Sequence, residues 1–282
     1  MNVLRTIPFS LILGLLAGCD IVNDPIPPAG SGGGGGGEGV TRRVLLEDMT
    51  GHTCNNCPGA ARIAQDLQAI YGEELVLVGV HCGSFSNPVA PIGDGVYDTD
   101  FRTPAGNDYR QAFQVTFFPA GLVSRRPFNG SVVVSEGSWS TAVADIIGEP
   151  SPFDLWFDTL EQGSGTVSTT VRLRLTETVQ GDHNLIVYLT EDHVVDWQTD
   201  SEASPPDVPD YDHRHVLRTN LNGTWGTPMI TGTAAAGDTI TLNFDNFALD
   251  PAWNTANLAL VAYLYDTSTD EVMQVTERKF QP

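Results

Sequence analysis

Two cysteines separated by two residues, Cys54 and Cys57, form the pattern in this chain with the most direct chemical meaning. A largely apolar run, residues 44–49, comes shortly before them, and a helical pattern begins directly after them. Unpaired backbone N–H groups and the dipole at a helix N-terminus favour a thiolate. A thiolate can attack a disulfide, and a second cysteine can resolve the mixed disulfide that forms. The spacing therefore predicts thiol–disulfide exchange, in which Cys54 attacks and Cys57 resolves.

Other roles for the cysteine pair are weaker or stay open. Haem attachment requires a histidine directly after the second cysteine, where this chain has Pro58. A peroxidatic cysteine requires a threonine three residues before it, where this chain has Gly51. A disulfide that only stabilises the loop remains an alternative to exchange.

Three side chains near the pair allow further interpretations. His52, if protonated, would stabilise the Cys54 thiolate, but a lone loop histidine is more often simply solvated. Cys82 follows a second apolar run and is either a third thiol close to the pair or an inert buried cysteine. With His52 and either His81 or Cys82, the pair would offer a zinc site, although one CxxC gives weaker support than two. We therefore expect no metal and no cofactor.

The N-terminus has the pattern of a bacterial lipoprotein signal. Residues 7–16 are mostly apolar but too short to cross a bilayer, and the sequence Leu-Ala-Gly-Cys ends at Cys19. This sequence resembles a lipobox, in which the cysteine becomes the lipidated first residue; an ordinary secretory signal is the alternative. We expect a signal peptide at 1–18, then lipidated Cys19 and a flexible glycine- and proline-rich tether over 19–39. Asp20 resembles an inner-membrane retention signal of enteric bacteria, a rule that other Gram-negative groups do not share.

Composition narrows the classes of partner. The formal net charge is −21, with 14 Lys and Arg against 35 Asp and Glu. Binding to phosphates depends on clusters of basic side chains, which this sequence lacks, so a nucleic-acid partner is excluded. Without Cys19, three cysteines remain, too few for a disulfide-based scaffold. An odd number that includes one CxxC indicates a reactive site.

Residues 40–149 have the pattern of an α/β segment. Apolar runs at 43–49 and 75–80 are typical of buried strands. Between them, apolar residues at helical spacing from Pro58 to Tyr71 predict a helix that stops at Gly72. Farther along we expect an irregular insertion, a short helix, a hairpin of two strands and a closing helix: 83–105, 106–114, 120–124, 132–134 and 139–147.

Residues 150–282 alternate apolar and polar side chains with a period of two, as half-buried strands do. Val171 and Leu173, for example, share one face, while Arg172 lies on the other. About seven such segments are present, the number expected of an immunoglobulin-like sandwich. They are 152–159, 166–176, 185–189, 213–220, 240–244, 258–264 and 271–280. Prolines and aspartates over 199–212 predict a surface loop.

The first segment resembles a thioredoxin fold in the order of its elements. A strand precedes the CxxC at a helix start, and a second strand and a later hairpin follow. Phe113 to Pro119 resembles the thioredoxin segment whose cis-proline faces the cysteines. The resemblance implies that Pro119 presents a backbone edge to a bound substrate. The chain departs from it because no tryptophan precedes Cys54 and because the insertion 83–105 lengthens the interval to Pro119.

The same resemblance implies a buried carboxylate that takes a proton from the second cysteine. Asp48 lies six residues before Cys54, at the spacing that thioredoxins use. Burial raises the pKa of a carboxyl group, so that it can act as a general base. Glu47 is the competing candidate, because one step along a strand changes the face.

Three longer motifs, spread over both segments, carry a second resemblance. They are 45–58 around the cysteines, His213 to Arg218, and Leu221 to Gly226. Together they resemble the outer membrane protein 28-related lipoproteins. This resemblance implies an envelope lipoprotein with a thioredoxin-like domain and a β-rich C-terminal domain, for which surface adhesion or receptor roles are proposed.

The β-rich segment holds two further groups of candidate ligands. His213 and His215 lie two residues apart and, with His193, could bind a metal, although surface histidines are commoner. Three aspartates could hold Ca²⁺ through their oxygens, without the spacing of a recognised calcium loop. These are Asp207, Asp210 and Asp212.

We therefore predict a thioredoxin-like domain over 40–149 followed by an all-β immunoglobulin-like sandwich over 150–282. The function predicted first is thiol–disulfide exchange on envelope or extracellular proteins. The alternative is a non-enzymatic surface binding or adhesion lipoprotein with a structural disulfide. In either case the membrane is contacted through lipid on Cys19, and the expected location is the cell envelope, at the periplasmic or surface face of the outer membrane.

Overall fold

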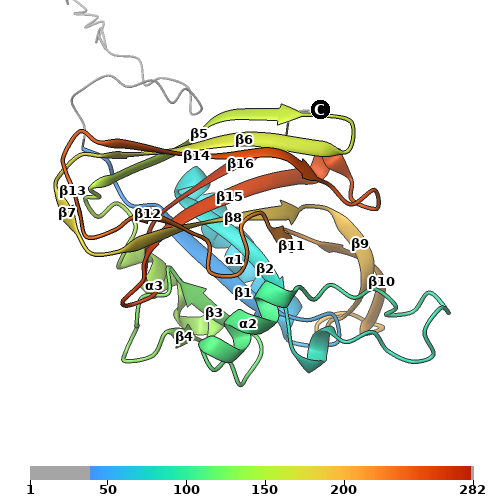
Figure 1. Ribbon diagram of the computed structural model, residues 1–282. Helices are drawn as coiled ribbons and strands as arrows, with labels where there is room; N and C mark the ends of the chain where they lie inside the picture. Colours follow the sequence, from blue (N-terminus) through green and yellow to red (C-terminus); the bar gives the residue numbers. More distant parts are fainter. Residues whose placement is uncertain (1–38, 281–282) are drawn as a thin grey trace, which may run out of the picture. The chain divides into compact units, whose positions relative to one another are not determined.

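A buried parallel strand pair forms the centre of the first segment. In the computed structural model, which describes residues 39–280, helix α1 (Cys57–Tyr71) connects β1 (Val44–Thr50) to β2 (Leu75–His81) (Figure 1). All seven residues of β1 are buried, which explains why its sequence is a continuous apolar run interrupted only by two acids. The expected signal peptide, the lipidated Cys19 and most of the tether lie outside the described residues.

Two short strands extend this pair, and two more helices pack beside it. Strand β3 (Ala120–Val123) is antiparallel to β1 and pairs in turn with β4 (Val133–Val134). The helices are α2 (Pro104–Ala112) and α3 (Trp139–Ala144). Single 3₁₀ turns cover Gly72–Glu74, Ser84–Ser86, Glu136–Ser138 and Thr255–Asn257. These bounds lie within a few residues of those expected from periodicity.

The second segment is built of strands. They are β5 (Phe153–Gln162), β6 (Thr166–Leu175), β7 (Val179–Gln180), β8 (His183–Glu191), β9 (Val194–Thr199), β10 (Asp207–His213), β11 (Val216–Asn220), β12 (Thr227–Ile230), β13 (Thr233–Ala234), β14 (Thr239–Ala248), β15 (Leu258–Asp266) and β16 (Val272–Lys279). Each of the seven expected segments overlaps one of the longer strands, and the others are short or polar strands that alternation did not reveal. The second segment is therefore rich in β strands, as predicted, and the described chain as a whole is mostly β.

One continuous sheet joins the two segments. Its order is β16-β15-β8-β11-β2-β1-β3-β4, with β12 added on β8. The join is the parallel contact of β11 with β2, where Val216 pairs with Gly79 and the Gly79 N–H donates to the His215 oxygen at 2.8 Å. All described residues thus belong to one compact unit.

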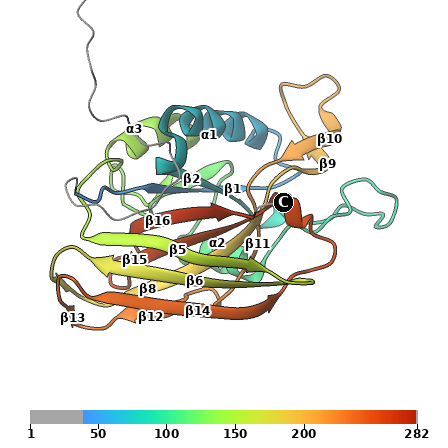
Figure 2. The same cartoon turned by 90° about the horizontal axis from the view of Figure 1, so that it is seen from above.

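Three apolar clusters fill the space on the two faces of this sheet. On one face, α1 and α3 pack over β1 and β2, while the three-stranded sheet β14-β6-β5 packs over β8 and β15 (Figure 2). The opposite face packs against α2 and includes buried residues of both segments, such as Leu45, Tyr109 and Tyr188. A layer of sheet on sheet therefore exists in the second segment, as expected, and its core is continuous with the first segment.

The segment 199–212 differs from the expectation of a surface loop. It contains the turn and second strand of an antiparallel hairpin, in which β10 pairs with β9. The sequence of β10 does not have the alternating pattern of a half-buried strand. It contains proline and aspartates, its side chains are largely exposed, and a bulge after Val208 breaks its register. This hairpin lies directly over the cysteine pair.

Candidate functional site

The cysteine pair forms a disulfide at the start of α1. The Cys54–Cys57 bond joins Cα atoms 5.4 Å apart, and Cys57 is the first residue of the helix. Cys54 lies in the turn before it, with its N–H bonded to the Gly51 oxygen at 3.0 Å. Pro58 occupies the first helical turn, where the absence of an N–H costs nothing. Cys54 is only 3% exposed and Cys57 only 1%.

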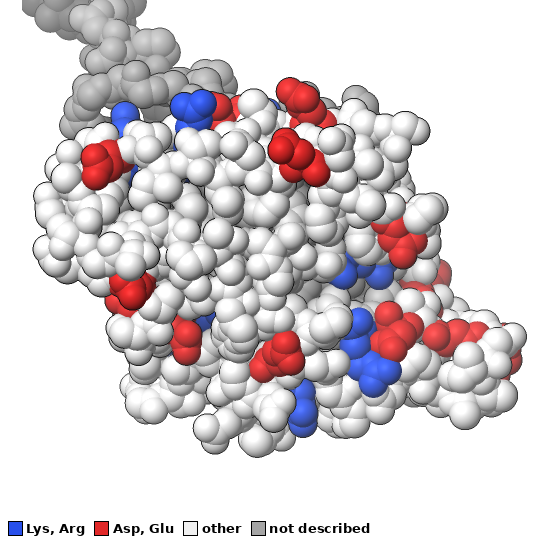
Figure 3. All heavy atoms as spheres, viewed as in Figure 1, with Lys and Arg blue, Asp and Glu red and all other residues white. Residues whose placement is uncertain are grey.

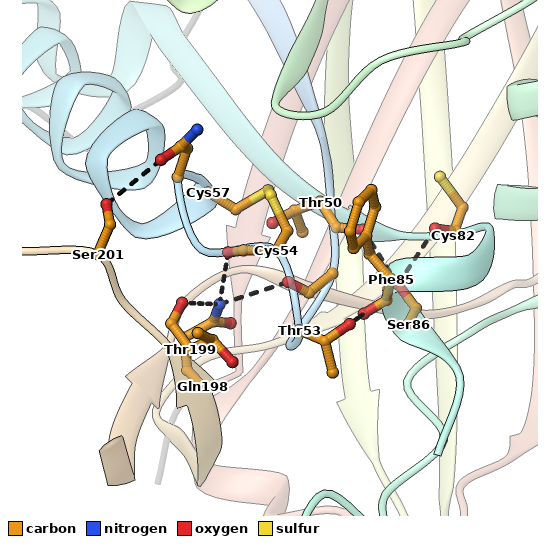
Figure 4. Close-up of a disulfide and its surroundings, with 12 residues drawn as sticks. Thr50, Thr53, Cys54, Cys57, Cys82, Phe85, Ser86, Gln198, Thr199 and Ser201 are labelled. Atoms are coloured by element: carbon orange, nitrogen blue, oxygen red, sulfur yellow. Dashed lines mark hydrogen bonds between the residues drawn. A yellow bond between two sulfur atoms is a disulfide. The ribbon is translucent and has the colours of Figure 1, made fainter. Parts of the chain in front are cut away.

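The β9–β10 hairpin covers the disulfide from one side (Figure 4). The Gln198 side-chain amide donates to the oxygens of Cys54 at 3.1 Å and Gly51 at 3.4 Å. Directly after it in the chain, the Thr199 N–H donates to the His52 oxygen at 2.9 Å, and the Ser201 N–H donates to the Asn55 oxygen at 2.8 Å. These contacts bind the hairpin to the CxxC loop by main-chain hydrogen bonds, as an added polypeptide strand would be bound.

Further contacts hold the hairpin in place. Arg62 of α1 forms an ion pair with Asp200 at 2.9 Å. Tyr97 belongs to the insertion 83–105. Its hydroxyl donates to Asp207 at 2.9 Å, and its ring packs against that of Trp197. The irregular insertion thus also holds the β9–β10 hairpin, hereafter the cover, in place over the disulfide.

A loop of the same insertion covers the disulfide from another side. The Phe85 oxygen accepts hydrogen bonds from the Thr53 N–H at 3.0 Å and the Thr53 hydroxyl at 2.9 Å. A Cβ on Gly51 would lie 2.6 Å from the Phe85 backbone, so only glycine permits this close approach. The Phe85 ring, 41% exposed, contacts the ring of Phe118.

Phe118 is joined to Pro119 by a cis peptide bond, as the sequence predicts. Pro119 is buried and directly precedes β3, whose first residue pairs with Met49 of β1. The proline therefore enters the sheet beside the strand that leads to the cysteines.

A cavity of about 50 Å³, lined by both apolar and polar side chains, lies beneath the hairpin. It is bounded by the ends of β1 and β2, the first turns of α1, and the end of β10. Its polar lining residues are Asp48, Thr50, Cys57, Gln65, His81, Gln198, Tyr211, His213, Arg214 and His215. The cavity thus brings the expected acid Asp48 to the same space as the resolving cysteine Cys57.

Asp48 is a buried acid without a full set of partners. It is 8% exposed, and no described atom bonds its Oδ1. Burial, with a smaller repulsion from Glu136, raises the pKa of Asp48 to about 7. The carboxyl group therefore takes up and releases a proton near neutral pH, which agrees with the expectation for a general base.

Glu47 does not reach the cavity, which corrects its place as a competing base. It lies on the opposite face of β1, fully buried, where both its oxygens bind Arg125 at 2.8 Å. The hydroxyl of Tyr188 also donates to it at 2.8 Å, and that of Tyr263 accepts from Arg125. The Glu47–Arg125 ion pair thus links the first segment to β8 and β15 and has a structural role.

Cys82 and His52 also point away from the disulfide. The Cys82 sulfur packs against Met49 Sδ at 3.9 Å, in the core on the far face of the sheet, and in Figure 4 it lies apart from the disulfide, beyond Phe85. Burial raises the pKa of the Cys82 thiol to about 12. The His52 ring bonds the Asn87 oxygen at 2.9 Å, and burial lowers its pKa, so it is uncharged at neutral pH. Neither group stabilises a Cys54 thiolate in this arrangement.

The candidate ligands of the second segment separate. His213 and His215 line the cavity, but His193 is exposed and pairs with Asp212 at 2.9 Å. Asp207 accepts from Tyr97, as described above, and does not converge with Asp212. Over residues 39–280, no group of three or more His, Cys, Asp or Glu side chains is arranged to hold a metal.

Acidic side chains are scattered over the surface in Figure 3, with wide uncharged areas between them. The arginines at the edge of the cover are paired rather than free; Arg62, Arg102 and Arg214 each bind a carboxylate. Among the described helices, none has the length and apolar character needed to cross a bilayer.

Sequence reasoning missed the cover and part of the cavity lining. Gln198 and Tyr211 lie in the β9–β10 hairpin, part of which the sequence predicts to be a loop, so no local signal links them to the cysteines. The sequence suggests His81 only as a zinc ligand, whereas the structure places it in the cavity lining. A usable signal was present, because His81 ends a strand in which every preceding residue is apolar or glycine.

The fold and the site together define a β-rich protein in which an α/β segment carries a covered CxxC disulfide above an acid-lined cavity. A profile of the family described as Outer membrane protein Omp28 matches residues 106–282. The chain therefore belongs to this outer membrane protein family, which agrees with the expected location in the cell envelope. No curated protein sequence matched the chain.

Two solved structures from Porphyromonas gingivalis are similar to this chain. HBP35 is 16% identical, with a TM-score of 0.62, and the match covers 87% of this chain and 78% of that one. A domain of the outer membrane lipoprotein Omp28 is 21% identical, with a TM-score of 0.31, and the match covers 47% of this chain and 90% of that one. At such low identity the likeness to HBP35 shows the fold alone.

Proposed function

We propose that this chain is a lipid-anchored envelope protein that carries out thiol–disulfide exchange on other envelope proteins through Cys54 and Cys57. The observation that carries the proposal is the buried Asp48 beside Cys57, in a cavity that both residues line. An unpaired buried carboxyl group is costly, by about 1–3 kcal/mol. A disulfide that only stabilised a loop would need no such acid, whereas exchange needs a group that takes the Cys57 proton.

The arrangement of elements around the disulfide supports a thioredoxin-like site. The order β1-α1-β2 with parallel strands, followed by β3 and β4 after the cis peptide at Pro119, is the one that such a site requires. The sulfurs lie at the start of α1, where the helix dipole lowers the pKa of a thiol. The β layers of the second segment then form an immunoglobulin-like partner domain whose hairpin regulates access.

The exchange proceeds in two steps. In the first, the Cys54 thiolate attacks a substrate disulfide, and one substrate sulfur leaves as a thiolate. In the second, Cys57 gives its proton to the Asp48 carboxylate and attacks Cys54, which releases the other substrate sulfur. Because Cys54 is 3% exposed, both steps require the β9–β10 hairpin to move aside.

The reduction potential of the Cys54–Cys57 pair tests this function. It is measured by equilibration with glutathione or dithiothreitol, with the two thiols quantified by mass after alkylation. A potential of about −120 to −270 mV is expected, the span of known exchange catalysts. A value below about −300 mV with slow exchange marks a structural disulfide and overturns the proposal.

Asp48→Asn provides the second test, with Asp66→Asn on the exposed side of α1 as a matched control. If Asp48 takes the Cys57 proton, its loss slows release of a mixed disulfide at pH 7 by about 10²-fold, at the lower limit for a general base. The control variant should resolve the mixed disulfide at the wild-type rate.

The burial of both sulfurs favours a second candidate function. If the disulfide is structural, the chain is a non-enzymatic surface binding or adhesion lipoprotein, attached to the outer membrane through Cys19. Under this alternative, Cys54→Ser with Cys57→Ser lowers the unfolding free energy but leaves partner binding by the folded protein intact. Absence of exchange in the wild-type protein, with retention of binding in the double variant, would select this candidate.

A further inference from the structure

We propose that His81 is a positioning residue for the proton transfer, because it holds cavity water between its imidazole and the Asp48 carboxyl group. This inference rests on the proposed exchange function and adds to it a residue outside the CxxC motif.

The strand register places Asp48 and His81 on one face. In the parallel pair, Asp48 is opposite Gly79, and Thr50 is opposite His81. Side chains two residues apart on a strand share a face, so His81 lies one step farther along the same face as Asp48. Both side chains line the cavity with Cys57.

Gly79 lets the main chain of the 214–215 segment approach β2 closely. It has no side chain, and a Cβ there would lie 3.1 Å from the Arg214 oxygen and 3.6 Å from the His215 oxygen. Gly79 lines the cavity of about 50 Å³ together with Asp48 and His81. A water molecule needs roughly 10–15 Å³ of such space, so several fit.

The unpaired atoms in this space require a hydrogen-bonding partner. Asp48 Oδ1 and both ring nitrogens of His81 are buried, and none has a partner among residues 39–280. Buried polar groups in folded proteins are almost always satisfied, by protein or by ordered water. Water in the cavity satisfies all three atoms, whereas an empty cavity would leave a carboxyl group and an imidazole bare.

Other charged or titratable groups face this pair from neighbouring elements. His213 of β10 lies with its ring centroid 5.4 Å from that of His81, and His52 and Arg218 also disfavour a charged His81. Glu136 is the charge that acts on Asp48. Burial of the imidazole, and after it these neighbours, lowers the pKa of His81 well below its usual value, so His81 is neutral, with one ring nitrogen as donor and the other as acceptor, which suits it to orient water.

During resolution, Cys57 Sγ bonds to Cys54 Sγ, the bond from Cys54 to the substrate sulfur breaks, and the substrate leaves as a thiolate with the electron pair. The Cys57 proton passes to cavity water, and that water gives a proton to Asp48. His81 remains neutral and holds the water by donating its N–H to the water oxygen. The enzyme pair is oxidised and the substrate disulfide is reduced.

The test uses His81→Phe in the full protein, with His183→Phe as the matched control, because His183 is equally buried but lies far from the cavity against Phe153. The first readout is the titration of Asp48 by carboxyl NMR in the disulfide form, which does not depend on exchange. Loss of ordered water removes stabilisation of the carboxylate, so the Asp48 pKa should rise by about one unit or more in His81→Phe and stay unchanged in the control.

The second readout is the pH profile of mixed-disulfide resolution. In His81→Phe the profile should shift to higher pH by the same amount as the Asp48 titration, with about a tenfold loss of rate at pH 7 and recovery at high pH. His81→Gln keeps hydrogen-bonding groups, so its pH profile should lie between those of wild type and His81→Phe. Combining His81→Phe with Asp48→Asn should slow resolution no further than Asp48→Asn alone.

The outcomes separate the two proposals. An Asp48 titration that is the same in His81→Phe and wild type overturns the role of His81, even if exchange is active. If His81→Phe does not fold, the same readouts on His81→Gln decide, and an unshifted Asp48 titration there overturns the role. If Asp48 shifts as expected but the wild-type protein neither forms nor resolves mixed disulfides, the water link stands and the exchange function fails.

Discussion

The Gln198 side-chain amide donates a hydrogen bond of 3.1 Å to the main-chain oxygen of Cys54, across 144 residues of sequence. Through this bond and its main-chain neighbours, a hairpin from the β-rich segment covers a disulfide of the α/β segment. Access of solvent to the cysteine pair therefore depends on the second segment as well as the first, because the hairpin must open to expose the sulfurs.

Gln198→Ala should expose the disulfide more often. The substitution removes two hydrogen bonds between the hairpin and the CxxC loop, each worth about 1 kcal/mol, so local opening and reduction by dithiothreitol should become about thirtyfold faster. Gln274→Ala is the matched control, since Gln274 is also buried and also donates to two main-chain oxygens, far from the cysteines. Equal reduction rates in wild type and Gln198→Ala would show that this bond does not limit access.

Asp48 should make stability fall as the pH rises. Its pKa is about 7 in the folded protein and 3.8 in an unfolded chain, so between these values the folded state holds a proton that the unfolded state releases. Unfolding then becomes easier with increasing pH. From pH 5 to pH 8, wild type should lose about 2–3 kcal/mol of unfolding free energy relative to Asp48→Asn, measured in urea. A difference that stays constant over this range would contradict the raised pKa.

Glu47→Gln should destabilise the protein strongly without changing the cysteine chemistry. It leaves Arg125 buried and charged without its partner, which costs about 3–5 kcal/mol. Asp154→Asn breaks the exposed pair with Arg174 and should cost less than about 1 kcal/mol. Urea unfolding measures both. Because Glu47 faces away from the cavity, a changed reduction potential in folded Glu47→Gln would refute its purely structural role.

Cys82 should not react while the protein is folded. With a thiol pKa of about 12, only about one part in ten thousand is thiolate at pH 8, and the side chain is fully buried. Iodoacetamide should therefore leave Cys82 unmodified in the native protein and alkylate it completely in urea, as read by peptide mass. Native alkylation at the rate of a free cysteine would mean that the core on this face opens readily.

Local patterns in the sequence determined the elements that carry the chemistry. The apolar runs at β1 and β2, the helical spacing of α1 and the alternation of the longer β strands are periodic signals that depend only on nearby residues. The position of the cysteines at the start of α1 follows from the same signals. The spacing of Asp48 from Cys54 singled out an acid that does line the cavity with Cys57.

The tertiary structure alone decided how these elements combine. Glu47 and Asp48 are adjacent acids on opposite faces of β1, so the sequence alone could not choose between them. The structure chooses, because Glu47 faces Arg125 whereas Asp48 faces the cavity that Cys57 also lines. The pairing of Gly79 with Val216 and the cover of Cys54 by Gln198 are contacts between distant residues. Periodicity records whether a side chain is buried, but the partner that buries it is chosen by the packing of the whole chain.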